Sequence, residues 1–139
     1  MNLFNCKISY LAQDENSGKI KKKTDIYEVE ATGFTDAETR LYQAIEPIIA
    51  DYELLAMKKS NIDEVIIDDI KELFFVVKTA MITFDQETGK ELKSTNNLLV
   101  QANSVEDATK KINERLKDSM ADYTIKSVTE TKILDIFLN

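Results

Sequence analysis

A cluster of lysines and three nearby aromatic residues are the side chains of this sequence best suited to binding chemistry. Lysines on two hairpin arms could follow a phosphate backbone, and aromatic rings beside them could stack on bases. The lysines are Lys19, Lys21, Lys22, Lys23, Lys90 and Lys93, and the aromatic residues are Tyr10, Tyr27 and Phe84. This pattern predicts a surface for single-stranded nucleic acid. The alternative explanation is a solvated hairpin end, on which lysines discourage edge-to-edge strand pairing.

The residue types that are missing restrict catalysis. The 139 residues contain no histidine, no tryptophan and one cysteine, Cys6. Ser-His-Asp and Cys-His nucleophiles therefore cannot form within the chain, and zinc sites lack their usual ligands. Gly18, Gly33 and Gly89 are isolated, so no glycine-rich phosphate loop is present. Carboxylate pairs could still transfer protons, but no pair stands out. We expect a non-catalytic protein with no metal site and no cofactor.

Charge and hydropathy indicate where the protein works. Lys and Arg total 18 against 25 Asp and Glu, a net charge of −7, which makes a nucleic-acid ligand less favourable overall. The longest apolar run, Leu73–Val77, is much shorter than the ~20 residues of a membrane span. One cysteine cannot form an internal disulfide, and Cys6 falls on the apolar side of an alternating segment. These features predict a cytoplasmic protein with no membrane partner and a buried, inert thiol.

The chain matches itself when it is shifted by 71 residues. Residues 1–68 and 72–139 align without a gap and share 15 identical pairs, whereas ordinary composition gives about 4 by chance. The clearest shared motif is Ala50-Asp51-Tyr52, which recurs as Ala121-Asp122-Tyr123. We predict a tandem duplication, with one repeat at 1–68 and the other at 72–139, packed together as one globular domain.

Each repeat is predicted to contain a hairpin, a helix and a further strand. Apolar and polar residues alternate over residues 4–10 and 75–81, which is typical of a half-buried strand. Gly18 and Gly89 can supply the positive φ of the turn that follows. Strands are expected at 53–60 and 124–131, with short last strands at 63–67 and 132–138. The predicted class is α+β, a duplicated ββαβ(β) unit with mostly antiparallel sheet and one helix per repeat.

Capping and periodicity define the two predicted helices. Thr35 with Glu38, and Ser104 with Asp107, have capping-box spacing. Pro47 should kink the first helix or end it early, because proline lacks an amide donor. The predicted apolar faces are Ala37, Leu41, Ala44, Ile45 and Ile48 in the first helix and Ala108, Ile112, Leu116 and Met120 in the second.

Several segments resemble a known family. They are Asn97–Ala102, Met120–Tyr123, Ser127–Thr131 and Ile133–Phe137. Together with the opening hairpin, they are similar to an uncharacterised domain-of-unknown-function family of Bacteroidetes bacteria and their phages. The resemblance covers nearly the whole chain and implies a bacterial or phage origin. It implies no catalytic residues.

Three functions remain open on the sequence alone. The first is binding of single-stranded nucleic acid through the lysine-bearing hairpins. The second is a protein-interaction or assembly module, either a homo-oligomer or a phage factor that engages a host protein through sheet edges. The third is a small-ligand-binding protein with a pocket at the interface of the repeats.

Overall fold

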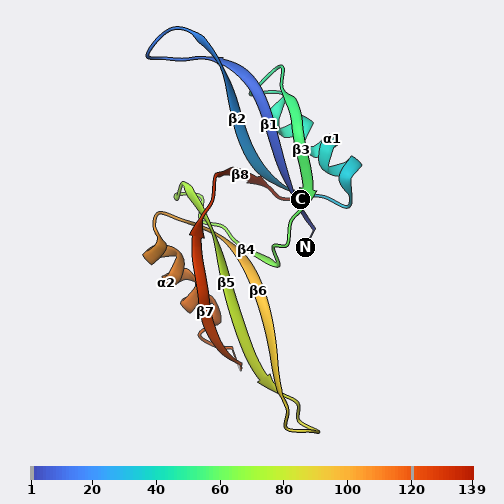
Figure 1. Ribbon diagram of the computed structural model, residues 1–139, viewed down its shortest axis with the longest axis vertical. Coiled ribbons are helices and arrows are strands. Elements are labelled where there is room, and N and C mark those ends of the chain that lie inside the picture. Colours follow the sequence, from blue (N-terminus) through green and yellow to red (C-terminus); the bar gives the residue numbers. More distant parts are fainter. Residues whose placement is uncertain (1, 120) are drawn as a thin grey trace. The chain divides into compact units, whose positions relative to one another are not determined.

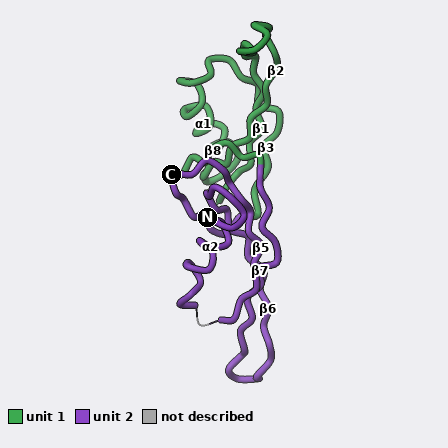
Figure 2. The backbone as a smooth tube through the Cα atoms, turned by 90° about the vertical axis from the view of Figure 1, so that its left-hand side faces the viewer, with its two compact units in different colours: residues 1–61, 132–139 green, residues 62–131 purple. Residues whose placement is uncertain are grey.

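The fold belongs to the α+β class, as predicted (Figure 1). The structure is a computed structural model that describes residues 2–119 and 121–139, so the predicted helix-face residue Met120 lies outside it. Within the described residues the chain forms two helices and eight strands, arranged in two four-stranded mixed sheets. The chain divides into two compact units, which are described separately (Figure 2): unit 1 comprises residues 1–61 and 132–139, and unit 2 comprises residues 62–131.

Unit 1 is a four-stranded sheet with one helix against one of its faces. Strands lie in the order β3-β1-β2-β8, antiparallel except for β8, which is parallel to β2. Its elements are β1 (Leu3–Gln13), β2 (Ile20–Glu30), α1 (Phe34–Ile45), β3 (Glu53–Lys59) and β8 (Ile133–Phe137). Alternate strand residues meet the apolar side of α1, and Cys6, Ile8, Val29 and Leu41 are completely buried there.

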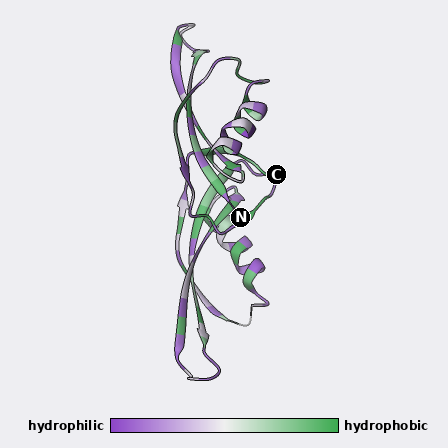
Figure 3. Cartoon of the chain, turned by 90° about the vertical axis from the view of Figure 1, so that its right-hand side faces the viewer, coloured by the Kyte–Doolittle hydropathy of each residue, from purple (hydrophilic) through white to green (hydrophobic). Residues whose placement is uncertain are grey.

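Unit 2 has the same spatial arrangement of four strands and one helix, although its short strand β4 comes before the other elements in the chain. Its sheet has the order β4-β6-β5-β7, with β4 parallel to β6 and the other pairs antiparallel. Its elements are β4 (Glu64–Ile66), β5 (Leu73–Phe84), β6 (Glu91–Ala102), α2 (Val105–Leu116) and β7 (Asp122–Glu130). Phe75, Val77, Val100 and Ile112 form the centre of its core. Figure 3 shows hydrophobic colour in the middle of the strands and hydrophilic colour toward the hairpin ends.

The short strands β4 and β8 are interchanged with respect to the sequence. The sequence places residues 63–67 at the end of the first repeat, yet β4 pairs with β6 in unit 2. Residues 132–138 end the second repeat, yet β8 pairs with β2 in unit 1. Both pairings are parallel, so the sheets are mixed, although four of the six strand pairs are antiparallel as expected.

The two hairpin turns have the same conformation, and both predicted glycines have a φ of 69°. In the first turn the Asp14 amide donates to the Lys19 carbonyl and the Gly18 amide donates to the Asp14 carbonyl, each at 2.8 Å. The second turn repeats both bonds with residues 85, 89 and 90. A positive φ is costly for residues with a Cβ, which explains why glycine occupies both positions.

The helix starts differ from the capping prediction in one case. Ser104 caps α2, and its side chain accepts a hydrogen bond from the Asp107 amide at 3.1 Å, as predicted. The Thr35–Glu38 box is wrong, because α1 begins after Gly33, which offers no side chain. Instead, the Asp36 carboxylate accepts the Thr32 amide at 2.9 Å. An acidic group there also favours the positive end of the helix dipole.

The helix ends correct two further expectations. Helix α1 ends at Ile45, and α2 ends at the matching residue, Leu116, without a proline. Pro47 therefore does not shorten α1 relative to α2. Ala37, Leu41 and Ile45 are buried as predicted, but Ile48 is 77% exposed, because the chain has already left the helix.

Candidate functional site

The six predicted lysines are exposed on the two hairpins, and those of the first hairpin do not share one face. Directly paired residues of an antiparallel hairpin point to the same side of the sheet. Lys23 pairs with Tyr10 on the side that bears α1, whereas Lys22 pairs with Leu11 on the opposite side. The Lys21 ammonium lies 2.8 Å from the Asp14 carboxylate, which partly neutralises it. The first arm is therefore not a continuous basic surface.

The second arm has a weaker basic character. Lys90 directly follows the turn glycine, and Lys93 lies 4.0 Å from the Glu91 carboxylate. Phe84 is 64% exposed and pairs with Glu91. Acidic and apolar residues therefore separate the lysines of this arm.

Two of the three predicted aromatic residues are tied into unit 1. Tyr27 is only 8% exposed, and the Phe137 ring stacks on it with 5.3 Å between centroids. Its hydroxyl donates to the Asp25 carboxylate at 3.1 Å. Burial and the Asp25 charge raise the pKa of the Tyr27 and Tyr10 hydroxyls. Base stacking by Tyr27 is thus ruled out by burial, and Tyr10 is half-buried.

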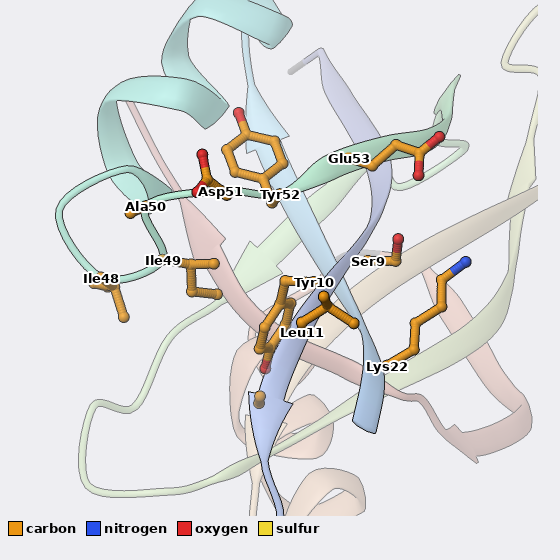
Figure 4. Close-up of a pocket in the computed structure, with 11 residues that line it drawn as sticks. Ser9, Tyr10, Leu11, Lys22, Ile48, Ile49, Ala50, Asp51, Tyr52 and Glu53 are labelled. Carbon is orange, nitrogen blue, oxygen red and sulfur yellow. The ribbon is translucent and has the colours of Figure 1, made fainter. Parts of the chain in front are cut away.

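A groove of about 830 Å³ opens beside the outer half of β1 (Figure 4). Tyr52, half-buried against the core, stands above the space in the close-up, and Ile48 and Ile49 lie on one side of it. Lys22, Asp51 and Glu53 add charged groups. The lining residues are Ser9, Tyr10, Leu11, Ala12, Lys22, Ile48, Ile49, Ala50, Asp51, Tyr52 and Glu53.

The groove lies along a free strand edge. Strand β3 pairs with β1 only from Phe4 to Ser9, although β1 continues to Gln13. Within residues 2–119 and 121–139, no strand pairs with Tyr10–Gln13 on the side away from β2. The Asp14–Lys19 bond makes the even-numbered residues of β1 those that bond to β2. Leu11 therefore turns its amide and carbonyl toward the groove.

The two edges of this arm differ in charge. Strand β8 pairs with β2 only over Ile26–Val29, so the outer edge of β2 before Ile26 is also free of a strand among the described residues. That segment carries three consecutive lysines, a common protection of an edge strand against unwanted pairing. The segment Tyr10–Gln13 carries no charged residue. The β1 edge is therefore the edge open to a further strand.

Unit 2 contains a smaller groove at the matching place. It has a volume of about 480 Å³ and lies between the end of β5 and the residues Ser119, Ala121 and Asp122. Strand β7 starts earlier than β3 and pairs with β5 as far as Ile82, which matches Leu11. Only Thr83 and Phe84 of β5 extend past this pairing.

A buried carboxylate lies outside the groove. Glu28 is 2% exposed and sits on the face of the sheet opposite α1. Its side chain accepts hydrogen bonds from the Asn5 amide at 3.1 Å and the Ser60 hydroxyl at 2.8 Å. Burial raises the pKa of Glu28, and these hydrogen bonds oppose part of that effect. The group is enclosed and fully partnered, which suits a structural role.

Comparison with known proteins gives a family. The model of the family described as "Domain of unknown function (DUF4494)" matches residues 2–139. The chain belongs to this family. The expectation from the resemblance is thereby confirmed at the level of an uncharacterised family, whereas the bacterial or phage origin stays a prediction. No curated protein and no solved structure matches the chain. Within the described residues, no helix is long and apolar enough to cross a membrane.

Sequence reasoning missed most of the groove. Ile48 was assigned to the apolar face of the first helix, and Ile49 and Leu11 were given no role. One signal was available: residues 47–49 read Pro-Ile-Ile, whereas the matching positions 118 and 119 are Asp and Ser. An exposed isoleucine at position 48, where the other repeat has a serine, indicates a surface difference between the repeats.

Proposed function

We propose that the protein is a non-catalytic binding module that takes up an extended polypeptide segment of another protein along the β1 edge. The observation that carries this proposal is the unpaired edge at Tyr10–Gln13, which lies beside an apolar groove. An added strand would gain main-chain hydrogen bonds from Leu11 and Gln13, and its alternate side chains would enter the groove.

Charge favours a partner other than a second copy. The chain has a net charge of −7, so two copies repel each other. Two of the three charged residues that line the groove, Asp51 and Glu53, are acidic, and the third is Lys22. The expected partner segment is therefore extended, with an apolar residue that faces Ile48 and Ile49 and basic residues beside it.

The test is a selection from a random nine-residue peptide library displayed on phage. We expect enrichment of sequences with alternating apolar residues and Lys or Arg. A synthetic copy of the enriched peptide, titrated into ¹⁵N-labelled protein, should shift the amide signals of residues 10–13 and 48–53. No enrichment, or shifts confined to other residues, would overturn the proposal.

A matched pair of variants distinguishes binding in the groove from nonspecific hydrophobic binding elsewhere on the surface. Ile48→Ser removes an isoleucine that is 77% exposed and lines the groove, and Ile70→Ser removes one that is 82% exposed and lies outside it. Exposed side chains contribute little to stability, so both variants should fold normally. Ile48→Ser should weaken the selected peptide about tenfold, which corresponds to ~1.4 kcal/mol of apolar contact. Ile70→Ser should leave its affinity unchanged.

Binding of single-stranded nucleic acid stays a second prediction, supported only by the exposure of Lys19, Lys22, Lys23 and Lys90. Its test is the fluorescence anisotropy of a labelled oligothymidine at low salt. If the lysines grip phosphates, binding should weaken as salt rises and in a Lys22→Glu, Lys23→Glu double variant. A flat titration at low salt would remove this alternative.

We also propose that units 1 and 2 derive from one duplicated ββαβ(β) unit. Besides the shared glycine turns, both sheets have an irregularity at the matching place, between Lys7 and Ile8 and between Lys78 and Thr79. If the units are equivalent, replacing residues 14–19 by the sequence of residues 85–90 should change stability by less than about 0.5 kcal/mol. A larger loss in thermal denaturation would contradict this origin.

A further inference from the structure

The start of β3 differs from the start of β7, although the sequences there are alike. Strand β7 begins at Asp122, and its first residues pair as Met81 with Tyr123 and Ile82 with Asp122. The matching Asp51 and Tyr52 have the same residue types, but β3 begins only at Glu53. Two residue pairs that are formed in unit 2 are therefore open in unit 1.

The register allows the open pairs to close. In both sheets the pairing before this point matches, because Ser9 faces Glu53 as Ala80 faces Thr124. Continuing the pairing of β3 would place Tyr52 opposite Tyr10 and Asp51 opposite Leu11. The outward amide and carbonyl of Leu11 would then be bonded within the chain.

From this comparison we infer that Asp51–Tyr52 is a closing segment, which competes with a bound peptide for the β1 edge. This inference rests on the proposed function, since it concerns regulation of the same groove. Closing would extend β3 by two residues, and the backbone of these residues would occupy the site on the β1 edge that the peptide ligand needs. The protein thus alternates between an open groove, as in unit 1, and a closed edge of the kind that unit 2 has.

Two differences between the units explain why unit 1 is open. In unit 2 the Tyr123 hydroxyl donates to the Asn113 side chain at 2.9 Å, which ties the start of β7 to α2. The residue of α1 that matches Asn113 is Tyr42, which offers no amide oxygen. Pro47 replaces Asp118 in the preceding turn, and its ring restricts the path of the chain. Unit 1 therefore lacks the hydrogen bond between the strand start and the helix, and its turn is stiffer.

The site of regulation can be tested without a ligand. The hydrogen exchange rate of the Leu11 amide, measured by NMR, reports closing directly, and the Ile82 amide is the paired reference in the same chain. The double variant Tyr42→Asn, Pro47→Asp imports the residues of unit 2. Tyr42 is 56% exposed, so the substitution should not disturb the core, and unchanged exchange of the Ile8 and Val29 amides will verify this.

We expect the Leu11 amide to exchange at least tenfold more slowly in the double variant and to approach the rate of Ile82. A Leu11 rate that is unchanged in both the double variant and Pro47→Asp alone would overturn the inference. The selected peptide should also bind the double variant at least tenfold more weakly. If the Leu11 amide exchanges more slowly in the double variant but the library selection yields no peptide, only the proposed function is refuted. If a peptide binds but the Leu11 exchange rate is unchanged in the variants, only the closing segment is refuted.

Discussion

The interchanged strands lead to a prediction that runs against sequence proximity. Phe137 lies seven residues after β7, the last strand of unit 2, but it pairs with Val29 and stacks on Tyr27 in unit 1. Ile66 occupies the matching position in β4 and pairs with Val100 in unit 2. Replacing Phe137 by alanine should therefore destabilise the hairpin at the start of the chain rather than its own sequence neighbours.

The expected size follows from burial. Truncation of a fully buried Phe costs about 3–5 kcal/mol, and Phe137 is half-buried, so we expect ~2 kcal/mol. This figure includes the stacking on Tyr27, which contributes ~0.5–1.5 kcal/mol. A loss of ~2 kcal/mol corresponds to about thirtyfold faster hydrogen exchange when the protein closes faster than the open amide exchanges, because the rate then follows the opening equilibrium. For Ile66→Ala we expect ~1–2 kcal/mol by the same reasoning.

The assay is hydrogen exchange followed by mass spectrometry of peptides that cover residues 20–30 and 91–102. Phe137→Ala should speed exchange mainly in 20–30, and Ile66→Ala mainly in 91–102. Each variant serves as the control for the other. If Phe137→Ala accelerated residues 91–102 as much as residues 20–30, or more, the interchanged pairing would be refuted.

Three further predictions concern single residues. Cys6 is fully buried and burial raises its pKa to about 12, so a disulfide reagent at pH 8 should label it only after denaturant is added; rapid labelling of native protein would contradict this. Burial raises the pKa of Glu28, so its ionisation should lower stability as pH rises above the ordinary carboxyl range, and Glu28→Gln should abolish this loss in urea titrations. Gly18→Ala should cost ~1 kcal/mol and Gly18→Asn less, and equal melting temperatures would argue against the positive φ.

The sequence was a good guide to local structure. Alternation located the long strands, and Gly18 and Gly89 located both turns, because a positive φ narrows the choice of residue. Ala37, Leu41, Ala108 and Ile112 were assigned to helix faces that are indeed buried. The lone cysteine was placed in the core on the same grounds.

Two predictions from the sequence were wrong for local physical reasons. The Thr35–Glu38 box fitted the spacing of a cap, but the helix starts after Gly33, which has no side chain to cap it. Aromatic rings near lysines suit nucleic acid, which is why the sequence pattern predicts a stacking role for Tyr27. Its alternation with Val29 already placed it on the buried side of β2, so the better explanation was present in the same pattern.

Sequence alone determined the type of each element and the side of each strand that is apolar, because both follow from residues close together in the chain. Only the tertiary structure decided which sheet each short strand joins, since β4 has three residues and carries too little pattern to specify a distant partner. It also decided that β3 stops short of Leu11. The start of β3 follows the α1–β3 loop, whose residues Ile49 and Tyr52 pack against the core of unit 1, and it is what leaves the candidate groove open.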